Sequence, residues 1–313
     1  HVLDGIDLPL GRGDTLGLVG ETGCGKSITA KAILRLLPIP PARVVAGEIW
    51  FQNEDLLKKS EEEMKRIRGR GIAMVFQDPM TFLNPVFTIE EQFVDVILAH
   101  EEAEEEGVAK KRGRNRGQAI ERTLELLREV KIPQPESRMK SYPHEFSGGM
   151  RQRVLIAMAL SGSPQILIAD EPTTALDMTI QAQILRLISD LVRHHGHSVL
   201  LISHDLGVVA RVCRRIAVMY AGTIVEHCST PQLFQGALHP YTHGLLNSIL
   251  TFSKRKGIAE TIKGVIPDLA EPPPGCRFHP RCLQTTDLCR VEKPAMIEVK
   301  KDHWVSCHHY GQG

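Results

Sequence analysis

The sequence contains an octapeptide, Gly20-Glu21-Thr22-Gly23-Cys24-Gly25-Lys26-Ser27, that fits the pattern G-x-x-x-x-G-K-[ST] without a mismatch. Glycines are needed in such a loop because its backbone N–H groups surround phosphate oxygens at angles and distances that side chains forbid. Lys26 would place a charge on the β- and γ-phosphates, and Ser27 would offer a hydroxyl to Mg²⁺. The octapeptide therefore predicts a binding site for a nucleoside triphosphate.

The residues around this loop favour the same interpretation. Residues 15–19 are apolar and predict a short buried strand, and residues 27–37 are apolar at helical spacing until Pro38 ends the pattern. The helix would direct the positive end of its dipole toward the bound anion. The alternative is a glycine turn without a ligand, and the order of strand, loop and helix argues against it.

Length and composition exclude several classes of protein. The chain has 313 residues, of which 42% are hydrophobic, and 38 basic side chains balance 37 acidic ones, so the charge does not call for nucleic acid or an anionic membrane surface. Neither an apolar run long enough to span a membrane nor a signal peptide is present, which predicts a soluble, cytoplasmic protein. The sequence begins with His1 rather than Met, within an apparent strand, so we expect the natural N-terminus to be missing.

Short alternating patterns flank the phosphate loop. Residues 1–10 and 44–51 alternate apolar and polar side chains, as strands of an antiparallel sheet with one covered face do. Farther on, residues 71–76 predict a strand that delivers Gln77 at its end. Pro79 then ends this strand, because proline cannot donate to a central ladder.

Helical patterns dominate the middle of the chain. A charged helix is predicted over 60–68, and the periodicity from residue 88 to about 160 predicts a helical subdomain. Within it, residues 101–117 carry five acidic and then five basic side chains. Such charge blocks cannot bury themselves, so we interpret them as a solvated insertion in preference to a partner-binding arm.

The second half of the chain alternates strands and helices. Strands are predicted over 165–169 and 198–202, with a helix between them over 179–195 and a hairpin over 216–226. Gly196 would end the helix. Short links between alternating elements predict an α/β fold with a mostly parallel sheet, whose ligands bind at the carboxyl ends of the strands.

Polar side chains follow three of these strands. Asp170 and Glu171 come directly after an apolar strand, which suits phosphoryl transfer: Asp170 would hold Mg²⁺ and Glu171 would polarise the attacking water. Gln77 and His204 each follow another strand. A glutamine or histidine in that position is usually a surface group, and only the joint placement indicates that Gln77 orients Mg²⁺ or water and that His204 contacts the γ-phosphate.

A second anion site is predicted at Ser147, Gly148 and Gly149, which open a helix that runs to Leu160. The exposed N–H groups of a helix N-terminus attract anions. The chain thus has two phosphate-seeking elements, but only one of them has a lysine and a magnesium-binding hydroxyl.

At this point the sequence resembles the ATP-binding subunits of ABC transporters over nearly its whole length. Residues 20–27 are similar to the family's Walker A loop, Gln77 to its Q-loop and residues 147–152 to its signature. Residues 166–171 resemble the Walker B strand, and residues 174–177 and His204 resemble the D-loop and the switch histidine.

The resemblance implies a P-loop NTPase core of the ABC ATPase type, with an antiparallel β-subdomain and a helical subdomain at about 85–160, in a domain of residues 1–235. It also implies that Ser147, Gly148 and Gly149 act in trans, on the nucleotide of a partner subunit. The family stacks adenine on an aromatic side chain upstream of the first strands, whereas here the first Phe, Tyr or Trp is Trp50.

Residues 236–313 narrow the resemblance. The segments 238–242 and 272–282 resemble the C-terminal extension of dipeptide and oligopeptide importer ATPases. Nickel importers and some sugar importers share this extension, so it indicates a subfamily and leaves the solute open.

Four of the seven cysteines gather in this proline-rich, loop-like extension, at Cys276, Cys282, Cys289 and Cys307. A disulfide is disfavoured in a reducing cytoplasm, and the spacing differs from the C-x₂-C arrangement of structural zinc. Four thiolates suit a [4Fe–4S] cluster or Zn²⁺. Members of the similar subfamily carry an iron–sulfur cluster at these cysteines, which favours the cluster over zinc and over free thiols. Its role would be structural, so nucleotide binding should survive its loss.

The resemblance implies the ATP-hydrolysing subunit of a binding-protein-dependent importer, most simply for peptides, at the cytoplasmic face of the cell membrane. Its partners would be a second, related ATPase subunit, two membrane permease subunits and, indirectly, a solute-binding protein, but no nucleic acid. The alternatives are a nickel or oligosaccharide importer of the same subfamily and a soluble ABC ATPase that acts on nucleic acid or ribosomes.

Overall fold

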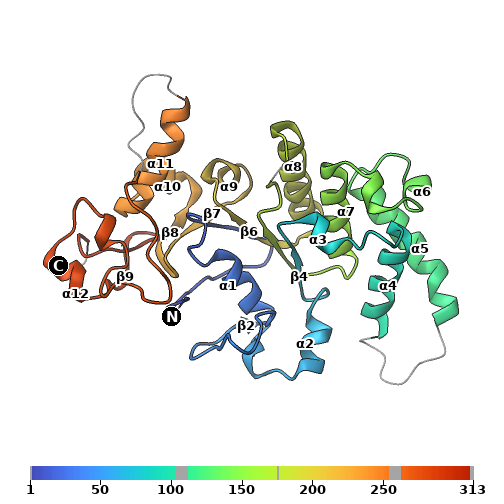
Figure 1. The fold of residues 1–313 in the computed structure, drawn as a ribbon, viewed down its shortest axis with the longest axis horizontal. Coiled ribbons are helices and arrows are strands. Elements are labelled where there is room, and N and C mark those ends of the chain that lie inside the picture. Colours follow the sequence, from blue (N-terminus) through green and yellow to red (C-terminus); the bar gives the residue numbers. More distant parts are fainter. Residues whose placement is uncertain (1, 103–111, 175, 254–261, 311–313) are drawn as a thin grey trace. The chain divides into compact units, whose positions relative to one another are not determined.

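The structure, a computed structural model, describes residues 2–102, 112–174, 176–253 and 262–310 (Figure 1). The chain forms two compact units, which we describe separately. The first unit consists of His1–Ala32, Leu36–Gly47 and Leu200–Gly313, and the second of Ile33–Arg35 and Glu48–Val199.

The first unit is built on a mixed sheet with the strand order β6-β1-β7-β8-β10-β9. β1 pairs with β7 in parallel, and β8 and β10 continue the sheet with antiparallel pairs. Every residue of β1 and β6 is buried, as in a central strand that is covered on both faces. The strands are β1 (Thr15–Val19), β6 (Ser198–Ser203, in this unit from Leu200), β7 (Arg215–Tyr220), β8 (Thr223–Ser229), β9 (Met296–Lys300) and β10 (His303–Ser306).

Helices cover this sheet. Helix α9 packs so closely on β1 that a Cβ atom at Gly17 would lie 1.9 Å from Val209 Cγ1. The helices of the first unit are α1 (Lys26–Ile33), α9 (Leu206–Val212), α10 (Thr230–Gly236), α11 (Pro240–Ser253), the 3₁₀ turn η3 (His279–Arg281) and α12 (Asp287–Val291).

The strand predicted within residues 1–10 is not observed, because residues 2–14, all of which are described, contain no strand. Gly5 and Gly13 have φ values of 61° and 67°, and Pro9 has no N–H, so this segment cannot follow a regular ladder. The strand predicted over 44–51 shrinks to β2 (Trp50–Phe51), which pairs in antiparallel fashion with β3 (Glu54–Asp55).

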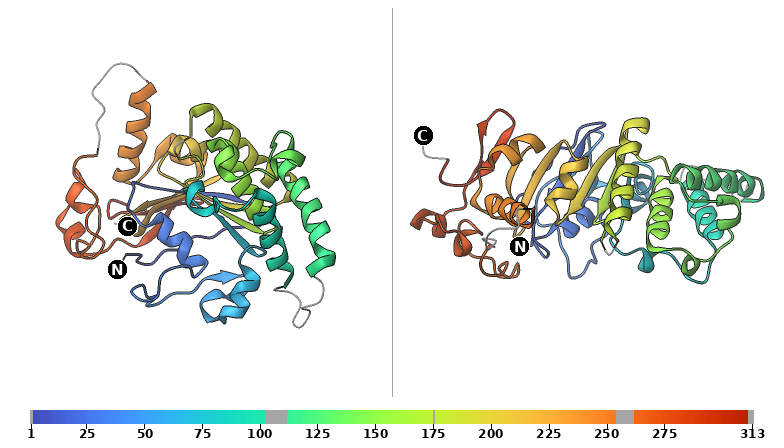
Figure 2. Two further views of the ribbon diagram at one scale, coloured as in Figure 1. Left: turned by 45° about the vertical axis from the view of Figure 1, so that its right-hand side comes forward. Right: turned by 90° about the horizontal axis from the view of Figure 1, so that it is seen from above.

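The second unit combines β4 (Ile72–Val75) and β5 (Ile166–Asp170), which pair in parallel, with a group of helices. α4 and α5 lie side by side, and α5 packs against α7 (Figure 2). The predicted helical region thus contains helices as expected. The remaining elements are η1 (Leu56–Lys58), α2 (Glu61–Ile67), α3 (Pro79–Phe82), α4 (Ile89–Glu102), α5 (Arg112–Glu129), α6 (Pro135–Arg138), η2 (Pro143–Glu145), α7 (Gly148–Leu160) and α8 (Met178–His195).

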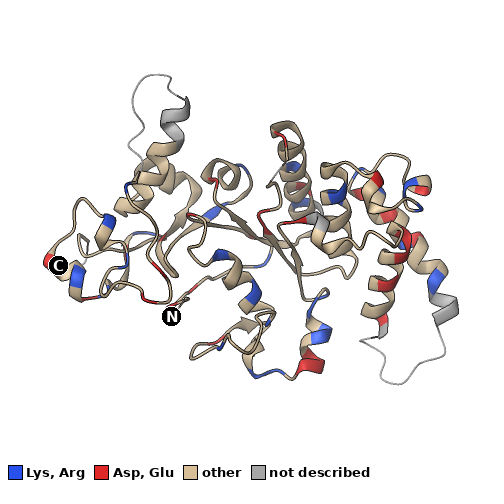
Figure 3. Ribbon diagram, viewed as in Figure 1, with Lys and Arg blue, Asp and Glu red and all other residues tan. Residues whose placement is uncertain are grey.

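Local sequence signals account for several helix ends. Ser60 caps α2 in a capping box with Glu63, and this helix has acidic residues in its first turn and basic residues in its last (Figure 3). Asp177 Oδ1 accepts the N–H groups that open α8, and Gly196, with a φ of 68°, ends that helix as predicted. The centre of the charged insertion, residues 103–111, lies outside the described residues.

The C-terminal extension is more regular than its loop-like sequence predicts. β10 pairs with both β8 and β9, and Val305 of β10 is fully buried against Leu238. A buried apolar side chain on a strand that extends the sheet provides hydrophobic stabilisation that the short pattern did not reveal. Among the residues that the structure describes, no helix is both long enough and apolar enough to cross a membrane.

Candidate nucleotide-binding site

The loop between β1 and α1 holds the predicted phosphate-binding residues. The buried Lys26 Nζ donates hydrogen bonds to the carbonyl oxygens of Gly20, at 2.8 Å, and Glu21, at 2.9 Å. A Cβ atom at Gly20 would lie 2.2 Å from Met219 O, and Gly25 has a φ of 110°. The loop can therefore adopt this shape only with glycine at these two positions.

Ser27 and Thr29 lie in the first turn of α1. The Thr29 N–H donates to Gly25 O at 2.9 Å, so the helix begins within the loop and directs its N-terminus there. His204 is exposed and follows β6, which neighbours β1 in the sheet. His204 and the loop therefore follow adjacent strands of the same unit, as the sequence predicts.

The second unit contains the carboxylates. Glu171 Oε2 accepts hydrogen bonds from Gln77 Nε2 at 3.1 Å and from Thr174 Oγ1 at 2.8 Å. Glu171 has a φ of 45°, an uncommon conformation for a residue with a side chain and one that concentrates at functional sites. Asp170, at the end of β5, is 4% exposed. The structure thus brings together the polar ends of β4 and β5.

The signature residues open α7 in the same unit. Ser147 is the N-cap, and its Oγ accepts the Met150 N–H at 3.4 Å. A Cβ atom at Gly149 would lie 2.4 Å from Ile180 Cγ2, and one at Gly148 would lie 3.4 Å from Leu176. Packing against α8 therefore requires a glycine at position 149, in addition to any role in binding an anion.

Two residues of the C-terminal extension contact the phosphate loop, and the sequence analysis assigned no role to either. The Glu21 N–H donates to Tyr241 Oη at 2.9 Å, and the Glu21 carboxylate pairs with Arg281. Both residues lie in segments that resemble the importer extension, which was the available signal. A match to an extension does not, however, indicate which residues contact a loop more than 200 positions earlier.

The four cysteines of the extension lie close enough to interact electrostatically. Burial and, after it, the charges of Cys289, Cys307 and Cys282 raise the pKa of Cys276 to about 11. The Cys276 N–H also donates to Cys289 O at 2.9 Å. All seven cysteines lie within the described residues, and none of them forms a disulfide.

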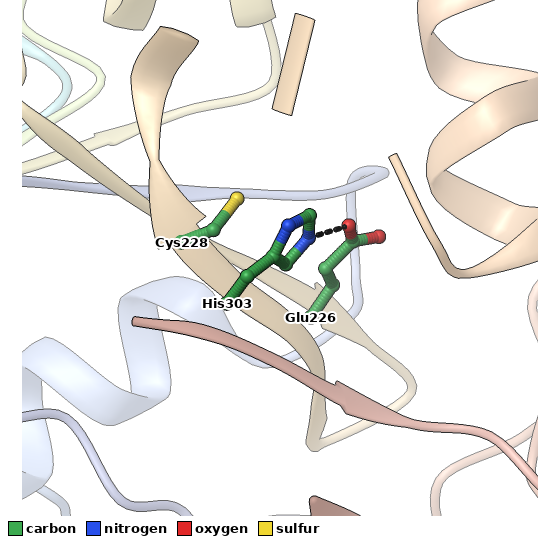
Figure 4. A group of neighbouring side chains, drawn as sticks. All are labelled: Glu226, Cys228 and His303. Atoms are coloured by element: carbon green, nitrogen blue, oxygen red, sulfur yellow. Dashed lines mark hydrogen bonds and ion pairs between the residues drawn. The ribbon is translucent and has the colours of Figure 1, made fainter. Parts of the chain in front are cut away.

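A separate buried group joins β8 to β10 (Figure 4). Within the described residues, Glu226, Cys228 and His303 are the one set of three potential metal ligands whose ligand atoms all lie within 4.8 Å of one another. The Glu226 carboxylate already accepts hydrogen bonds from His303 Nε2 at 2.7 Å and from the N–H groups of Leu238 and His239 at 2.8 and 2.9 Å. We therefore interpret this group as a polar lock that fixes the start of α11 on the sheet.

The fold and the loop define a P-loop nucleotide-binding protein. Solved structures support this class. A dimeric post-hydrolysis state of the ATP-binding cassette MJ0796 bound to ADP and Pi aligns with a TM-score of 0.61 and 26% identity, covering 73% of this chain and 90% of that one. A dimeric structure of MJ0796, described as a bacterial ABC transporter cassette, aligns with a TM-score of 0.60 and 28% identity, with the same coverage.

The chain belongs to the ABC transporter family, which matches residues 3–174, and residues 225–289 match the oligopeptide/dipeptide transporter C-terminal region. It is 49% identical over 309 residues to a probable peptide ABC transporter ATP-binding protein of Sinorhizobium fredii, covering 98% of this chain and 89% of that protein. It is 47% identical over 306 residues to the oligopeptide transport ATP-binding protein OppD of Bacillus subtilis, covering 97% and 82%. The predicted fold class, family and ATPase activity are thereby confirmed.

Proposed function

We propose that this chain is the ATP-hydrolysing subunit of a binding-protein-dependent importer of di- or oligopeptides, at the cytoplasmic face of the cell membrane. The observation that carries this proposal is the oligopeptide/dipeptide C-terminal region at residues 225–289, which follows an ABC cassette in the same chain. The peptide transport named for the relatives supports the same solute class. ATP would close a dimer of ATPase subunits, and hydrolysis would reopen it.

The proposed partners are a second, related ATPase chain, two permease subunits and, through them, a solute-binding protein. The dimeric form of the similar cassettes supports pairing of two ATPase subunits. Affinity purification of the tagged full chain from membranes tests this: two membrane subunits and a second ATPase should copurify, and deletion of the chain should abolish uptake of a labelled dipeptide. Copurification with ribosomes or nucleic acid would instead favour a soluble ABC ATPase.

In the proposed mechanism the loop Gly20–Ser27 binds the phosphates, with Lys26 on the β- and γ-phosphates. Mg²⁺, when bound, would neutralise developing charge on the phosphates. The hydroxyl of Ser27, the carboxylate of Asp170 and the amide oxygen of Gln77 offer the oxygen ligands that this hard cation takes. Ser147, Gly148 and Gly149 would contact the nucleotide of the partner subunit.

Glu171 is the proposed general base. Its hydrogen bond from Gln77 Nε2 orients the carboxylate, and Gln77 can release this bond to hold water or Mg²⁺. His204 would donate to the γ-phosphate. This division of roles rests on the sequence, in which Gln77, Glu171 and His204 each follow a strand.

For the extension we propose a [4Fe–4S] cluster held by Cys276, Cys282, Cys289 and Cys307, with Zn²⁺ as the alternative. Four thiols gathered in an extension of the oligopeptide/dipeptide transporter type support this proposal. Anaerobically purified protein should be brown with about four irons per chain. Colourless protein with one tightly held zinc would refute the cluster.

We further propose residues 1–235 as the ATPase domain, with its helical subdomain at about 85–160, and residues 236–313 as the importer-type extension. The cassette match over residues 3–174 lies within the first of these domains, whereas the extension match begins at residue 225, before the proposed boundary.

A further inference from the structure

Glu21, the second residue of the phosphate loop, is held at three points. Its carbonyl oxygen accepts hydrogen bonds from Lys26 Nζ at 2.9 Å and from the Cys24 N–H at 3.3 Å. Its N–H donates to Tyr241 Oη at 2.9 Å, and its carboxylate pairs with Arg281. The first contacts lie within the loop, whereas the other two reach into the C-terminal extension.

The pair between Glu21 and Arg281 has the geometry of a strong interaction. The two guanidinium nitrogens, Nη1 and Nη2, donate to the two carboxylate oxygens at 2.6 and 3.0 Å, which is the bidentate arrangement. The Arg281 side chain is 5% exposed and lies over the Tyr220 ring, 5.7 Å from its centroid.

Tyr241 is fixed just as firmly. The residue is fully buried, and its ring packs edge-on against Tyr220 with a centroid separation of 4.7 Å. Its own N–H donates to His239 Nδ1 at 3.1 Å, and the His239 N–H is held by Glu226 of the polar lock. Packing and backbone hydrogen bonds therefore hold in place the tyrosine whose hydroxyl accepts the Glu21 N–H.

A second arginine of the extension is connected to the loop through the turn at residues 221 and 222. Arg277 Nη1 donates to Ala221 O, and the next residue, Gly222, donates its N–H to Cys24 O at 2.7 Å. Between the two arginines, Phe278 is buried against the rings of Tyr220 and Tyr241. The segment from Cys276 to Cys282 thus carries two arginines and an aromatic anchor toward the phosphate loop.

We propose that Arg281 and Tyr241 are positioning residues for ATP binding: they hold Glu21, whose carbonyl oxygen in turn holds the Lys26 ammonium in the loop. The proposal rests on the assignment of Gly20–Ser27 as the phosphate-binding loop. Under this proposal the C-terminal extension is part of the nucleotide site of its own chain, because two of its side chains hold the phosphate loop in place.

The test is a double-mutant cycle on ATP affinity, measured by titration of the purified full chain with a fluorescent ATP analogue. Arg281→Met should weaken binding about tenfold, because the loop loses its bidentate anchor. Arg281→Lys should lose less, since it keeps the charge but not the fork. The double variant Glu21→Gln with Arg281→Met should bind ATP no more weakly than whichever of the two single variants has the lower affinity.

Two controls accompany this test. One shows whether loss of any ion pair lowers ATP affinity, and the other tests the assignment of the phosphate loop. Arg128→Met removes an equally short ion pair, with Glu136 at 2.5 Å, whose side chains are 57% and 59% exposed, and should leave ATP affinity unchanged. Lys26→Ala should abolish binding. Normal binding by Lys26→Ala would refute the loop assignment itself.

Wild-type ATP affinity in folded Arg281→Met, or losses that multiply in the double variant, would overturn the positioning role alone. Folding is checked by thermal melting. Because the anchor shapes the binding loop and does not touch the reacting water, hydrolysis should show a raised KM with a nearly unchanged kcat. A lowered kcat at unchanged KM would contradict the proposal, as would failure of Arg281→Lys to restore any affinity.

Discussion

Glu171 combines, in one residue, a left-handed backbone and a carboxylate held by Gln77 and Thr174. If this carboxylate polarises the attacking water, Glu171→Gln should lower ATP turnover by roughly 10²–10⁴-fold, the usual loss for a general base, and leave ATP affinity intact. The two effects are measured by phosphate release from the assembled transporter and by nucleotide titration of the chain.

Glu125→Gln is a matched control for this experiment, because Glu125 is exposed and pairs only with the neighbouring Arg122 among the contacts observed for it. Its turnover should equal that of the wild type. Near-normal hydrolysis by Glu171→Gln would remove Glu171 from the mechanism.

Substitutions of Lys26 and of Ser147 should have different effects on ATP binding, although both residues are predicted to bind phosphate. Lys26→Ala removes the charge from the chain's own loop and should abolish ATP binding by the isolated chain. Ser147→Arg alters the N-cap of α7 and should spare this binding while blocking ATP-driven dimerisation, because its target is the partner's nucleotide. Light scattering of the chain mixed with the partner ATPase and ATP measures dimerisation. Equal loss of ATP affinity in both variants would refute action in trans.

At the scale of elements, the segment between α10 and α11, which is hydrogen-bonded to Glu226 of β8, buries a histidine. His239 is 1% exposed, and burial, followed by the charges of His243 and His309, lowers its pKa to about 3. The unfolded chain binds a proton near pH 6.5 whereas the folded chain does not, so stability is full above about pH 6.5 and is lost as the pH falls toward 3. The free energy of unfolding should fall by up to about 1.4 kcal/mol per pH unit in this window.

His239→Asn should remove this component, because an amide does not titrate and its oxygen can still accept the Tyr241 N–H. Denaturant titrations at pH 7, 6 and 5 compare the slopes. The half-buried His227 also has a lowered pKa and contributes in both proteins, so only the difference between variants is informative. His144→Asn, at an exposed position, should keep the wild-type slope. An equal slope in His239→Asn would contradict the buried neutral histidine.

At the scale of the whole molecule, the structure changes what we expect from loss of the proposed metal. From the sequence, Cys282→Ser should disturb only the extension. In the structure, Arg281 directly precedes Cys282 and pairs with Glu21 of the phosphate loop. Cys282→Ser should therefore lose the metal and also weaken ATP binding, by about the same tenfold factor as Arg281→Met.

Metal analysis and nucleotide titration of the same sample measure the two effects together. Cys213→Ser is the control, because Cys213 is buried at the end of α9, outside the extension, and should retain both metal and ATP affinity. Metal loss with unchanged ATP affinity would show that the metal site does not influence the phosphate loop, and that Cys282→Ser disturbs only the extension.

Much of the fold was predictable because its signals are local. The strand over 15–19, the helix end at Gly196 and the hairpin within 216–226 depend on apolar runs, on a glycine in a left-handed conformation and on short links. The strand predicted within residues 1–10 was wrong, because alternation alone does not provide a partner strand. The predicted roles of Gln77, Asp170, Glu171, His204 and Ser147 remain predictions, although Gln77 and Glu171 do meet.

The sequence by itself determined the nucleotide loop, since eight adjacent residues carry both the geometry and the chemistry of phosphate binding. It also determined the family, because the ordered motifs are each contiguous. Only the tertiary structure decided that Arg281 and Tyr241 hold this loop, because 260 and 220 positions separate them from Glu21. Contacts at such separations depend on how β8, β10 and α11 pack, and packing is a property of the folded chain that no local pattern of residues encodes.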